Sequence, residues 1–230
     1  MSVMHLRFGG DASVRDNLPQ PQQAPSGGTI SALRVQIPAL QALAPYIAQP
    51  RSTAFDLGFG SGVMMAMLLA VAGKGAIVTG VDLEDKIAVA RRNLLQSSSS
   101  CPFTPFAEES FNLLGGDAFS YLPRWHKEGR RFDVVYSGCS MDPNTDQLKL
   151  FLSTLKPTGA AVFNLGGPGA QYMYFVAESG RICERLMAVG FMMAESSTTP
   201  TRKKQVPLEP AALSEWIQKN VQFSHGKEEL

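Results

Sequence analysis

The sequence has few of the residues that build disulfide frameworks and metal centres. It holds three cysteines and three histidines in 230 residues. Three widely spaced cysteines, an odd number, are not the pattern of a disulfide framework, and they suit a reducing compartment, which predicts a cytoplasmic protein. The histidines form no cluster with metal-ligand spacing, so the sequence predicts no metal site.

The chain also lacks a strong charge of either sign and any long apolar run. Its formal net charge is +1, whereas nucleic-acid-binding proteins show a clear basic excess, so we expect no nucleic-acid partner. No apolar run approaches the ~20 residues that span a membrane, and the N-terminus has no signal-peptide core. We therefore expect no membrane association. No sequence feature fixes an oligomeric state, and we expect a monomer.

The C-terminus is the one place with a targeting-like pattern. Residues 227–230 read Lys-Glu-Glu-Leu and resemble an ER-retrieval tail. Because no entry signal accompanies this tail, the favoured interpretation is a charged, frayed terminus.

The most informative stretch is a glycine-rich loop early in the chain. An apolar run meets Asp56 and is followed by three alternate glycines, Gly58, Gly60 and Gly62. Alternate glycines let the backbone turn sharply and let a ligand approach where a Cβ would collide. A dinucleotide-binding loop requires Gly-x-Gly-x-x-Gly, and Val63 occupies the position of its third glycine. The loop therefore predicts a nucleotide-type ligand other than a dinucleotide.

Apolar patterning around this loop predicts alternating strands and helices. We expect a first helix that begins near Pro38 and ends before Pro50. A turn signal at Ser179-Gly180 favours a hairpin over one long helix in the residues that flank it. The expected strands are 53–57, 76–81, 111–114, 132–136 and 160–165, the hairpin strands are 171–178 and 182–188, and the further helices are 61–72, 84–96, 145–155 and 210–220.

This alternation predicts an α/β fold, because parallel strands require helical crossovers. We expect a doubly wound, mostly parallel, seven-stranded sheet of Rossmann-like type with a C-terminal antiparallel hairpin. Residues 1–28 carry glycine, proline and glutamine in a loose pattern and are predicted to be an extended arm. Residues 29–230 are predicted to form a single domain.

The glycine loop and the following strand ends resemble class I S-adenosylmethionine-dependent methyltransferases. Asp56 precedes the alternate glycines, and Asp82 and Asp117 close the second and third predicted strands. The resemblance implies S-adenosylmethionine as cofactor, with Asp82 on the ribose hydroxyls, Asp117 on the adenine amino group and Asp56 near the methionine ammonium. The implied cofactor residues are Asp56, Gly58, Phe59, Gly60, Gly62, Asp82, Leu83, Asp117 and Ala118.

An upstream segment narrows the resemblance. Residues 28–32 read Gly-Thr-Ile-Ser-Ala about 25 residues before the glycine loop, and they look like the Thr-Ile-Ser-Ala segment of protein-L-isoaspartate O-methyltransferases. The similarity covers approximately residues 27–195. It implies an isoaspartyl-containing protein or peptide as methyl acceptor and places Ser31, as the catalytic residue, beside the acceptor carboxylate. The implied substrate residues are Thr29, Ile30, Ser137 and Gly138.

The chain departs from that family at two points, so other functions stay open. Residues 33–36 read Leu-Arg-Val-Gln where many members continue Pro-His-Met-His, and a short arm replaces the usual N-terminal helical region. The alternatives are a small-molecule O-methyltransferase, for which Asp142 is a displaced metal-ligand candidate, and a cofactor-binding protein-interaction module with little or no turnover. For Ser31 the alternative role is a helix N-cap.

Overall fold

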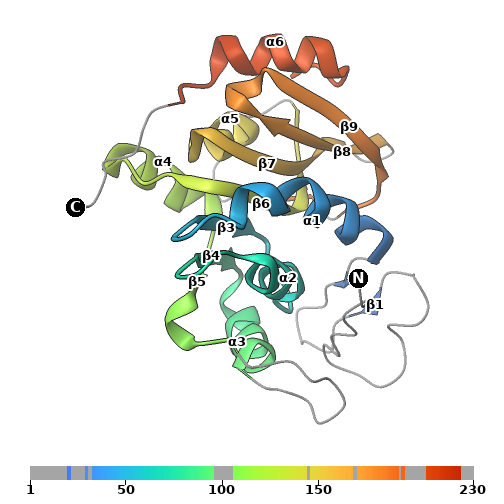
Figure 1. Ribbon diagram of the computed structural model, residues 1–230. Coiled ribbons are helices and arrows are strands. Elements are labelled where there is room, and N and C mark those ends of the chain that lie inside the picture. The colour runs from blue at the N-terminus through green and yellow to red at the C-terminus, as the bar shows by residue number, and fades with distance from the viewer. Residues whose placement is uncertain are drawn as a thin grey trace.

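A computed structural model describes most of the chain as a sheet covered by helices on both faces (Figure 1). The described residues are 20–21, 29–30, 33–95, 106–143, 146–167, 170–191, 193–194 and 206–223. The strands are β1 (Gln20–Pro21), β2 (Thr29–Ile30), β3 (Thr53–Leu57), β4 (Ile77–Asp82), β5 (Phe111–Gly115), β6 (Phe132–Met141), β7 (Leu155–Gly167), β8 (Ala170–Ala177) and β9 (Ile182–Val189).

Seven of these strands form one sheet in the order β5-β4-β3-β6-β7-β8-β9. The strands from β5 to β7 in this order run parallel to their neighbours, and β8 is antiparallel to both β7 and β9. The mostly parallel sheet and the C-terminal hairpin predicted from the sequence are thereby confirmed. The remaining two strands, β1 and β2, pair antiparallel with each other.

Helices pack on both faces because the central strands are apolar on both sides. Phe55 lies on one face and contacts the rings of Trp125, Phe132 and Phe151 at centroid distances of 5.2, 5.5 and 6.0 Å. The helices are α1 (Leu33–Ile47), α2 (Val63–Val71), α3 (Ile87–Leu95), α4 (Ala118–Glu128), α5 (Gln147–Leu152) and α6 (Pro210–Asn220), with 3-10 turns η2 (Glu84–Lys86), η3 (Glu108–Ser110) and η4 (Glu178–Gly180).

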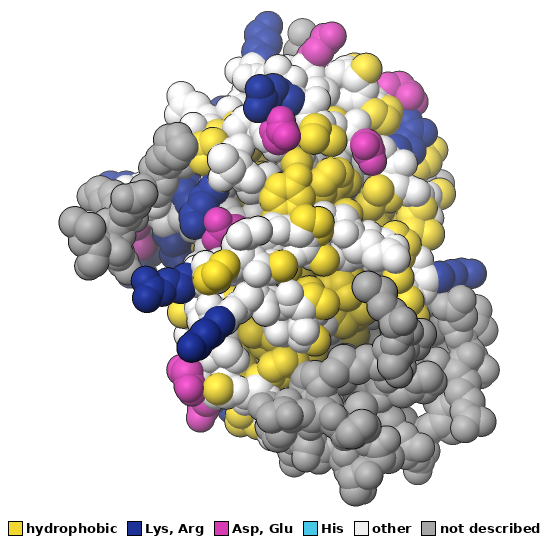
Figure 2. Space-filling view, viewed as in Figure 1, with side chains coloured by type: hydrophobic (Ala, Val, Ile, Leu, Met, Phe, Trp, Pro, Cys, Tyr) yellow, Lys and Arg dark blue, Asp and Glu magenta, His cyan; other side chains and the backbone are white. Residues whose placement is uncertain are grey.

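Two hydrophobic clusters correspond to the two faces. The cluster around Phe55 includes residues of α4, α5 and α6. The other cluster includes residues of α1, α2 and α3. Figure 2 shows hydrophobic side chains over the α1 face and charged side chains mainly around the top and left edges. Among the described helices, none is long and apolar enough to cross a membrane.

The first helix differs from its prediction at one end. It begins at Leu33, five residues before Pro38, and contains Pro45 as well. An interior proline costs about 3 kcal/mol, whereas burial of Leu43 and Ile47 contributes about 1.5–3 kcal/mol each. Both side chains are fully buried, so tertiary packing overrides the local proline signal.

Other differences concern helix and strand lengths. No helix was predicted for residues 118–128, where α4 buries Phe119, Leu122 and Trp125 despite the interior Pro123. Strand β6 continues past residue 136 to Met141, and β7 begins at residue 155 rather than 160. Residue 155 pairs with Phe132 of β6, so this long-range pairing shortens the predicted helix 145–155.

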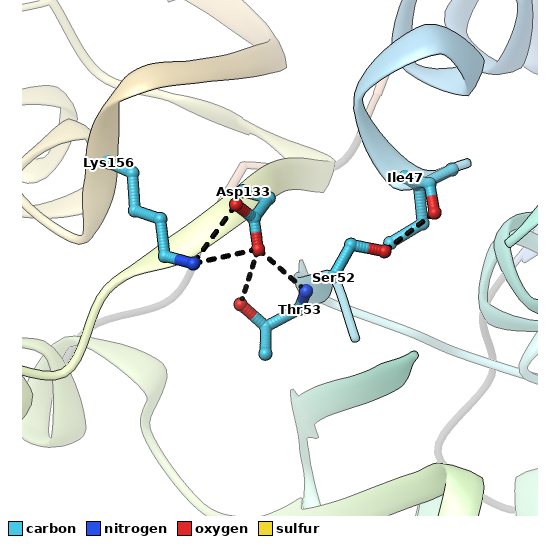
Figure 3. A network of polar contacts seen from close by, with 5 residues as sticks. All are labelled: Ile47, Ser52, Thr53, Asp133 and Lys156. Carbon is cyan, nitrogen blue, oxygen red and sulfur yellow. Dashed lines mark hydrogen bonds and ion pairs between the residues drawn. The ribbon is translucent and has the colours of Figure 1, made fainter. Parts of the chain in front are cut away.

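Polar contacts hold together the edge of the sheet where the parallel strands begin, here called the amino edge (Figure 3). Asp133 of β6 accepts hydrogen bonds from the Thr53 backbone N–H at 2.8 Å and the Thr53 hydroxyl at 3.0 Å. It also accepts from Lys156 Nζ at 3.0 Å. The Ser52 hydroxyl donates to the Ile47 carbonyl at 2.6 Å, which ties the end of α1 to this edge.

Candidate active site at the carboxyl ends of the strands

The predicted glycine loop joins β3 to α2 at the opposite edge, where the parallel strands end, here called the carboxyl edge. Gly58, Gly60 and Gly62 have φ angles of 79°, 56° and 86°. These angles lie in the left-handed region, which other L-residues adopt only with strain. Gly62 is the N-cap residue of α2 and has no side chain that could cap the first-turn N–H groups. Such N–H groups at the start of a helix favour anionic and dipolar ligands.

The structure brings the end of β6 against this loop. A Cβ on Gly138 would lie 2.4 Å from the Gly58 carbonyl oxygen. A Cβ on Gly58 would in turn lie 3.4 Å from the Cys139 Sγ. The two backbones therefore approach as closely as only glycine permits, and the predicted substrate residues Ser137 and Gly138 lie beside the predicted cofactor loop.

Asp82 connects the end of β4 to the same loop. One carboxylate oxygen accepts a hydrogen bond from the Gly60 N–H at 2.6 Å, and the other accepts from the Leu83 N–H at 2.7 Å. Burial raises the pKa of Asp82, and these two hydrogen bonds oppose the rise. A carboxylate has about four lone-pair sites, so two remain for other donors. The bond from Gly60 to Asp82, which braces the glycine loop, was not predicted from the sequence.

Asp56 is the most unusual residue of the site. Its side chain is fully buried on β3, and neither carboxylate oxygen accepts a hydrogen bond from any described residue. Burial, with a smaller contribution from the charge of Asp82, raises its pKa well above the ordinary value. A buried carboxylate without a donor is costly unless a cation or donor joins it. Asp56 therefore has the burial and the unpartnered oxygens expected of a carboxylate that binds a positively charged ligand.

Asp117 and Leu83 occupy the other predicted cofactor positions at the ends of β5 and β4. The Asp117 side chain caps α4 by accepting from the Phe119 N–H at 2.8 Å. Leu83 is 44% exposed, and Ile77 is the other exposed large hydrophobic side chain among the described residues. An exposed leucine next to Asp82 provides an apolar surface at the carboxyl edge of the sheet.

Two predicted cofactor residues turn their side chains into the core instead. Phe59 is buried, and a Cβ on Gly80 would lie 2.6 Å from its ring. Ala118 is buried in the cluster around Phe55. These two residues can therefore contact a ligand only through their backbone atoms.

The predicted acceptor residues are only partly described. Ser31 lies outside the described residues. Thr29 and Ile30 form β2, of which the structure describes the backbone alone. The Ser137 hydroxyl is buried and donates to the Cys139 carbonyl at 2.7 Å, so it is turned toward its own loop. Within the described ranges, no group of three or more His, Cys, Asp or Glu could hold a metal ion.

Two buried residues near this edge were missed in the sequence. Gln36 of α1 and Asn164 of β7 each have a side-chain oxygen without a donor among the described residues. The Asn164 amide nitrogen donates to the Ser137 carbonyl at 2.9 Å. Their signals are visible in retrospect, because Asn164 interrupts an apolar strand and Gln36 belongs to the segment that departs from the isoaspartate family.

Comparison with known proteins supports the fold. No protein-family model and no curated protein matches the sequence. A Plasmodium falciparum crystal structure assigned to protein-L-isoaspartate O-methyltransferase, in complex with S-adenosyl-L-homocysteine, is similar at 24% identity and a TM-score of 0.58, over 76% of this chain and 80% of that chain. Another structure, a protein-L-isoaspartate O-methyltransferase, is 13% identical with a TM-score of 0.64, over 85% of this chain and 59% of that chain. The chain therefore has the fold of class I S-adenosylmethionine-dependent methyltransferases, and it resembles their isoaspartate-directed members.

Proposed function

We propose that this protein is an S-adenosylmethionine-dependent O-methyltransferase that methylates the side-chain carboxylate of isoaspartyl residues in damaged proteins. The observation that carries the proposal is the buried, donor-free carboxylate of Asp56 directly before the glycine loop. The cofactor's methionine end carries an ammonium group that would supply the missing donors. The bound S-adenosyl-L-homocysteine in the similar Plasmodium structure supports the same ligand class.

The ribose and the adenine of the cofactor also have matching groups at the carboxyl edge. Asp82 has lone pairs left for two ribose hydroxyls after its bonds to Gly60 and Leu83. Leu83 offers apolar surface to the adenine ring. Asp117 accepts a bond from the Phe119 N–H and keeps acceptor capacity for the adenine amino group.

The chemistry asks little of the protein beyond placement. When bound, S-adenosylmethionine supplies a methyl group activated on a sulfonium. The proposed acceptor carboxylate is already ionised near pH 7, so the chain needs no strong general base. Its residues must hold the two reactants in line and exclude water, and such orientation is worth up to about 7–11 kcal/mol in ideal cases. We propose that Ser31 borders the acceptor carboxylate and helps to orient it.

We also propose that residues 29–230 form the single catalytic domain and that residues 1–28 form an arm. In this sequence the arm replaces the N-terminal region that helps to shape the peptide groove of the isoaspartate family, and residues 33–36 differ from that family's pattern.

A methyl-transfer assay on paired peptides tests the function. The two peptides have the same sequence and differ only in an aspartyl or isoaspartyl linkage. We expect methyl ester on the isoaspartyl peptide alone, and we expect Ser31→Ala to lower its kcat with little change in cofactor affinity. Cofactor binding without transfer to either peptide would point to a small-molecule acceptor or to a binding module. Unchanged turnover of Ser31→Ala would leave Ser31 as a helix cap.

A further inference from the structure

Four buried side-chain oxygens of this protein accept no hydrogen bond from the described residues. They are the two carboxylate oxygens of Asp56, Gln36 Oε1 and Asn164 Oδ1. Buried polar atoms in native proteins nearly always have partners, so each exception calls for an explanation. All four atoms are acceptors, and what they lack is a donor. The proposed cofactor ammonium accounts for Asp56, which leaves the two neutral amide oxygens of Gln36 and Asn164.

Gln36 lies on the side of α1 that packs against the sheet. The buried stripe of this helix is Gln36, Ala39, Leu43 and Ile47, and the helix packs on α2, β6 and β7. The carbonyl of Ile47 accepts a bond at the amino edge. Eleven residues of helix separate Gln36 from Ile47, which corresponds to about 16 Å toward the carboxyl edge at 1.5 Å per residue.

Asn164 lies on the same face of the sheet and at a similar height. Val162 of β7 belongs to the cluster that includes α1, and Asn164 follows two residues later, so both side chains point toward that helix. Tyr136 of β6 pairs with Asp56 on one side and with Val162 on the other, so Val162 and Asp56 lie at the same position along the strand direction. Asn164 is therefore five residues farther along the strands than Thr53, which corresponds to about 16 Å toward the carboxyl edge at 3.3 Å per residue. Both amide oxygens thus lie between α1 and the sheet, near its carboxyl edge.

The orientation of the Asn164 amide follows from its other hydrogen bond. Its nitrogen donates to the Ser137 carbonyl at 2.9 Å, which fixes the oxygen as the unpartnered atom. The same bond joins Asn164 to Ser137, next to Gly138 and the cofactor loop. Asn164 is therefore connected to the proposed acceptor side of the site rather than to the adenine side at β4 and β5.

We propose that Gln36 and Asn164 form an acceptor pair for a neutral N–H group of the methyl acceptor. On the proposed function, on which this inference rests, that group is a backbone amide next to the isoaspartyl residue. Amide oxygens carry no net charge and suit a neutral donor, whereas the Asp56 carboxylate suits the ammonium. A site that hydrogen-bonds a substrate N–H rejects an analogue without it, because the buried oxygens then stay unpaired.

A backbone amide-to-ester exchange tests the pair directly. Two isoaspartyl peptides are compared, one with its amide N–H next to the isoaspartyl residue and one with an ester oxygen in its place. Their affinities are measured by calorimetry in the presence of S-adenosylhomocysteine, so that no turnover is needed. We expect the wild-type protein to bind the amide peptide about tenfold more tightly than the ester peptide, the effect of one lost hydrogen bond to a buried partner.

The matched variants are Gln36→Met and Gln41→Met, both on α1. Methionine has nearly the shape of glutamine without the amide, and Gln41 is exposed on the same helix. Gln36→Met should reduce the amide preference to about twofold or less, and Gln41→Met should keep it at about tenfold. Asn164→Leu is a second test of the same expectation. Because Gln36→Met removes a buried unpaired oxygen, it should remain folded, and its thermal unfolding verifies this. Asn164→Leu also removes the hydrogen bond to the Ser137 carbonyl, so its thermal unfolding is measured as well.

The outcomes separate this inference from the proposed function. Methylation of the isoaspartyl peptide together with an amide preference that Gln36→Met leaves intact overturns the acceptor pair alone. An amide preference that Gln36→Met abolishes, without any methyl transfer by the wild-type protein, supports the pair and overturns the proposed function. Absence of both methylation and amide preference overturns the two together.

Discussion

The carboxylates at the two edges of the parallel sheet differ in their hydrogen-bond partners. At the amino edge, Asp133 accepts hydrogen bonds from Thr53 and Lys156 (Figure 3). At the carboxyl edge, Asp56 is more deeply buried and accepts none from the described residues. The chain completes its own polar contacts at one edge and leaves acceptors open at the other. The difference supports the proposal that the carboxyl edge binds the cofactor, whereas the contacts at the amino edge stabilise the fold.

Asp82 stands between these two extremes. Its carboxylate accepts from the Gly60 and Leu83 N–H groups and still has lone pairs for a ligand. It shapes the glycine loop before any ligand arrives, which is the preorganisation that a tight site requires.

Asp82→Ala should weaken cofactor binding most. The variant removes the proposed partner of both ribose hydroxyls and the brace on Gly60, so we expect cofactor affinity to fall by about 100-fold, equivalent to about 2.7 kcal/mol. Calorimetry with S-adenosylhomocysteine measures this. Asp85→Ala removes a neighbouring, more exposed carboxylate and is the matched control. An affinity equal to wild type in Asp82→Ala would refute the ribose placement.

Asp133→Ala should affect stability and spare binding. The substitution leaves the Thr53 N–H and Lys156 ammonium without their acceptor, so we expect the free energy of unfolding to fall by about 2 kcal/mol. Urea unfolding monitored by circular dichroism measures the change. Cofactor affinity should stay within about twofold of wild type, because Asp133 lies at the edge away from the glycine loop. A large loss of cofactor affinity in a folded protein would contradict the division between the two edges.

Asp56→Asn should stabilise the ligand-free protein near pH 7 while weakening cofactor binding. The native pKa of Asp56 is raised above its unfolded value by burial, so the native state binds more protons than the unfolded state between those two values. Stability from this group is therefore present below about pH 4, the unfolded pKa, and is lost as pH rises through the folded pKa. At pH 7 we expect Asp56→Asn to unfold with about 1–2 kcal/mol more free energy than wild type.

The pH dependence is the control for that prediction. The stability difference between Asp56→Asn and wild type should shrink as pH falls toward 4, since the unfolded carboxylate is then protonated as well. Cofactor binding to wild type should release a proton, because a bound ammonium favours the ionised form of Asp56. A stability difference that stays constant from pH 7 to pH 4 would indicate that Asp56 is not the titrating group.

Leu83→Ala should have the smallest effect. Removal of apolar surface from the adenine position should lower cofactor affinity by about fivefold, which corresponds to about 1 kcal/mol. Ile77→Ala provides the control, because Ile77 is the other exposed large hydrophobic residue and begins the same strand at the amino edge. Ile77→Ala should bind the cofactor as wild type does. Equal losses in the two variants would mean that Leu83 makes no special contact.

Local pattern was sufficient for much of the fold. Thr53–Leu57 and Pro210–Asn220 match their predicted bounds, since the first is a short apolar strand and the second begins with a helix-compatible proline. The hairpin of β8 and β9 also follows from its turn signal. The first helix was misjudged because Pro38 is a local signal, whereas burial against the sheet determines where the helix begins.

The sequence by itself determined the order of the seven main-sheet strands along the chain, the glycine loop and the carboxylates at the strand ends, because turn chemistry and apolar periodicity are local properties. Only the tertiary structure decided which of those carboxylates have partners. The bond from Gly60 to Asp82 and the missing donors at Asp56, Gln36 and Asn164 depend on segments far apart in the chain. Whether a buried polar atom has a hydrogen-bond partner is decided by the packing of the whole molecule, and it distinguishes the carboxyl edge of this sheet from the amino edge.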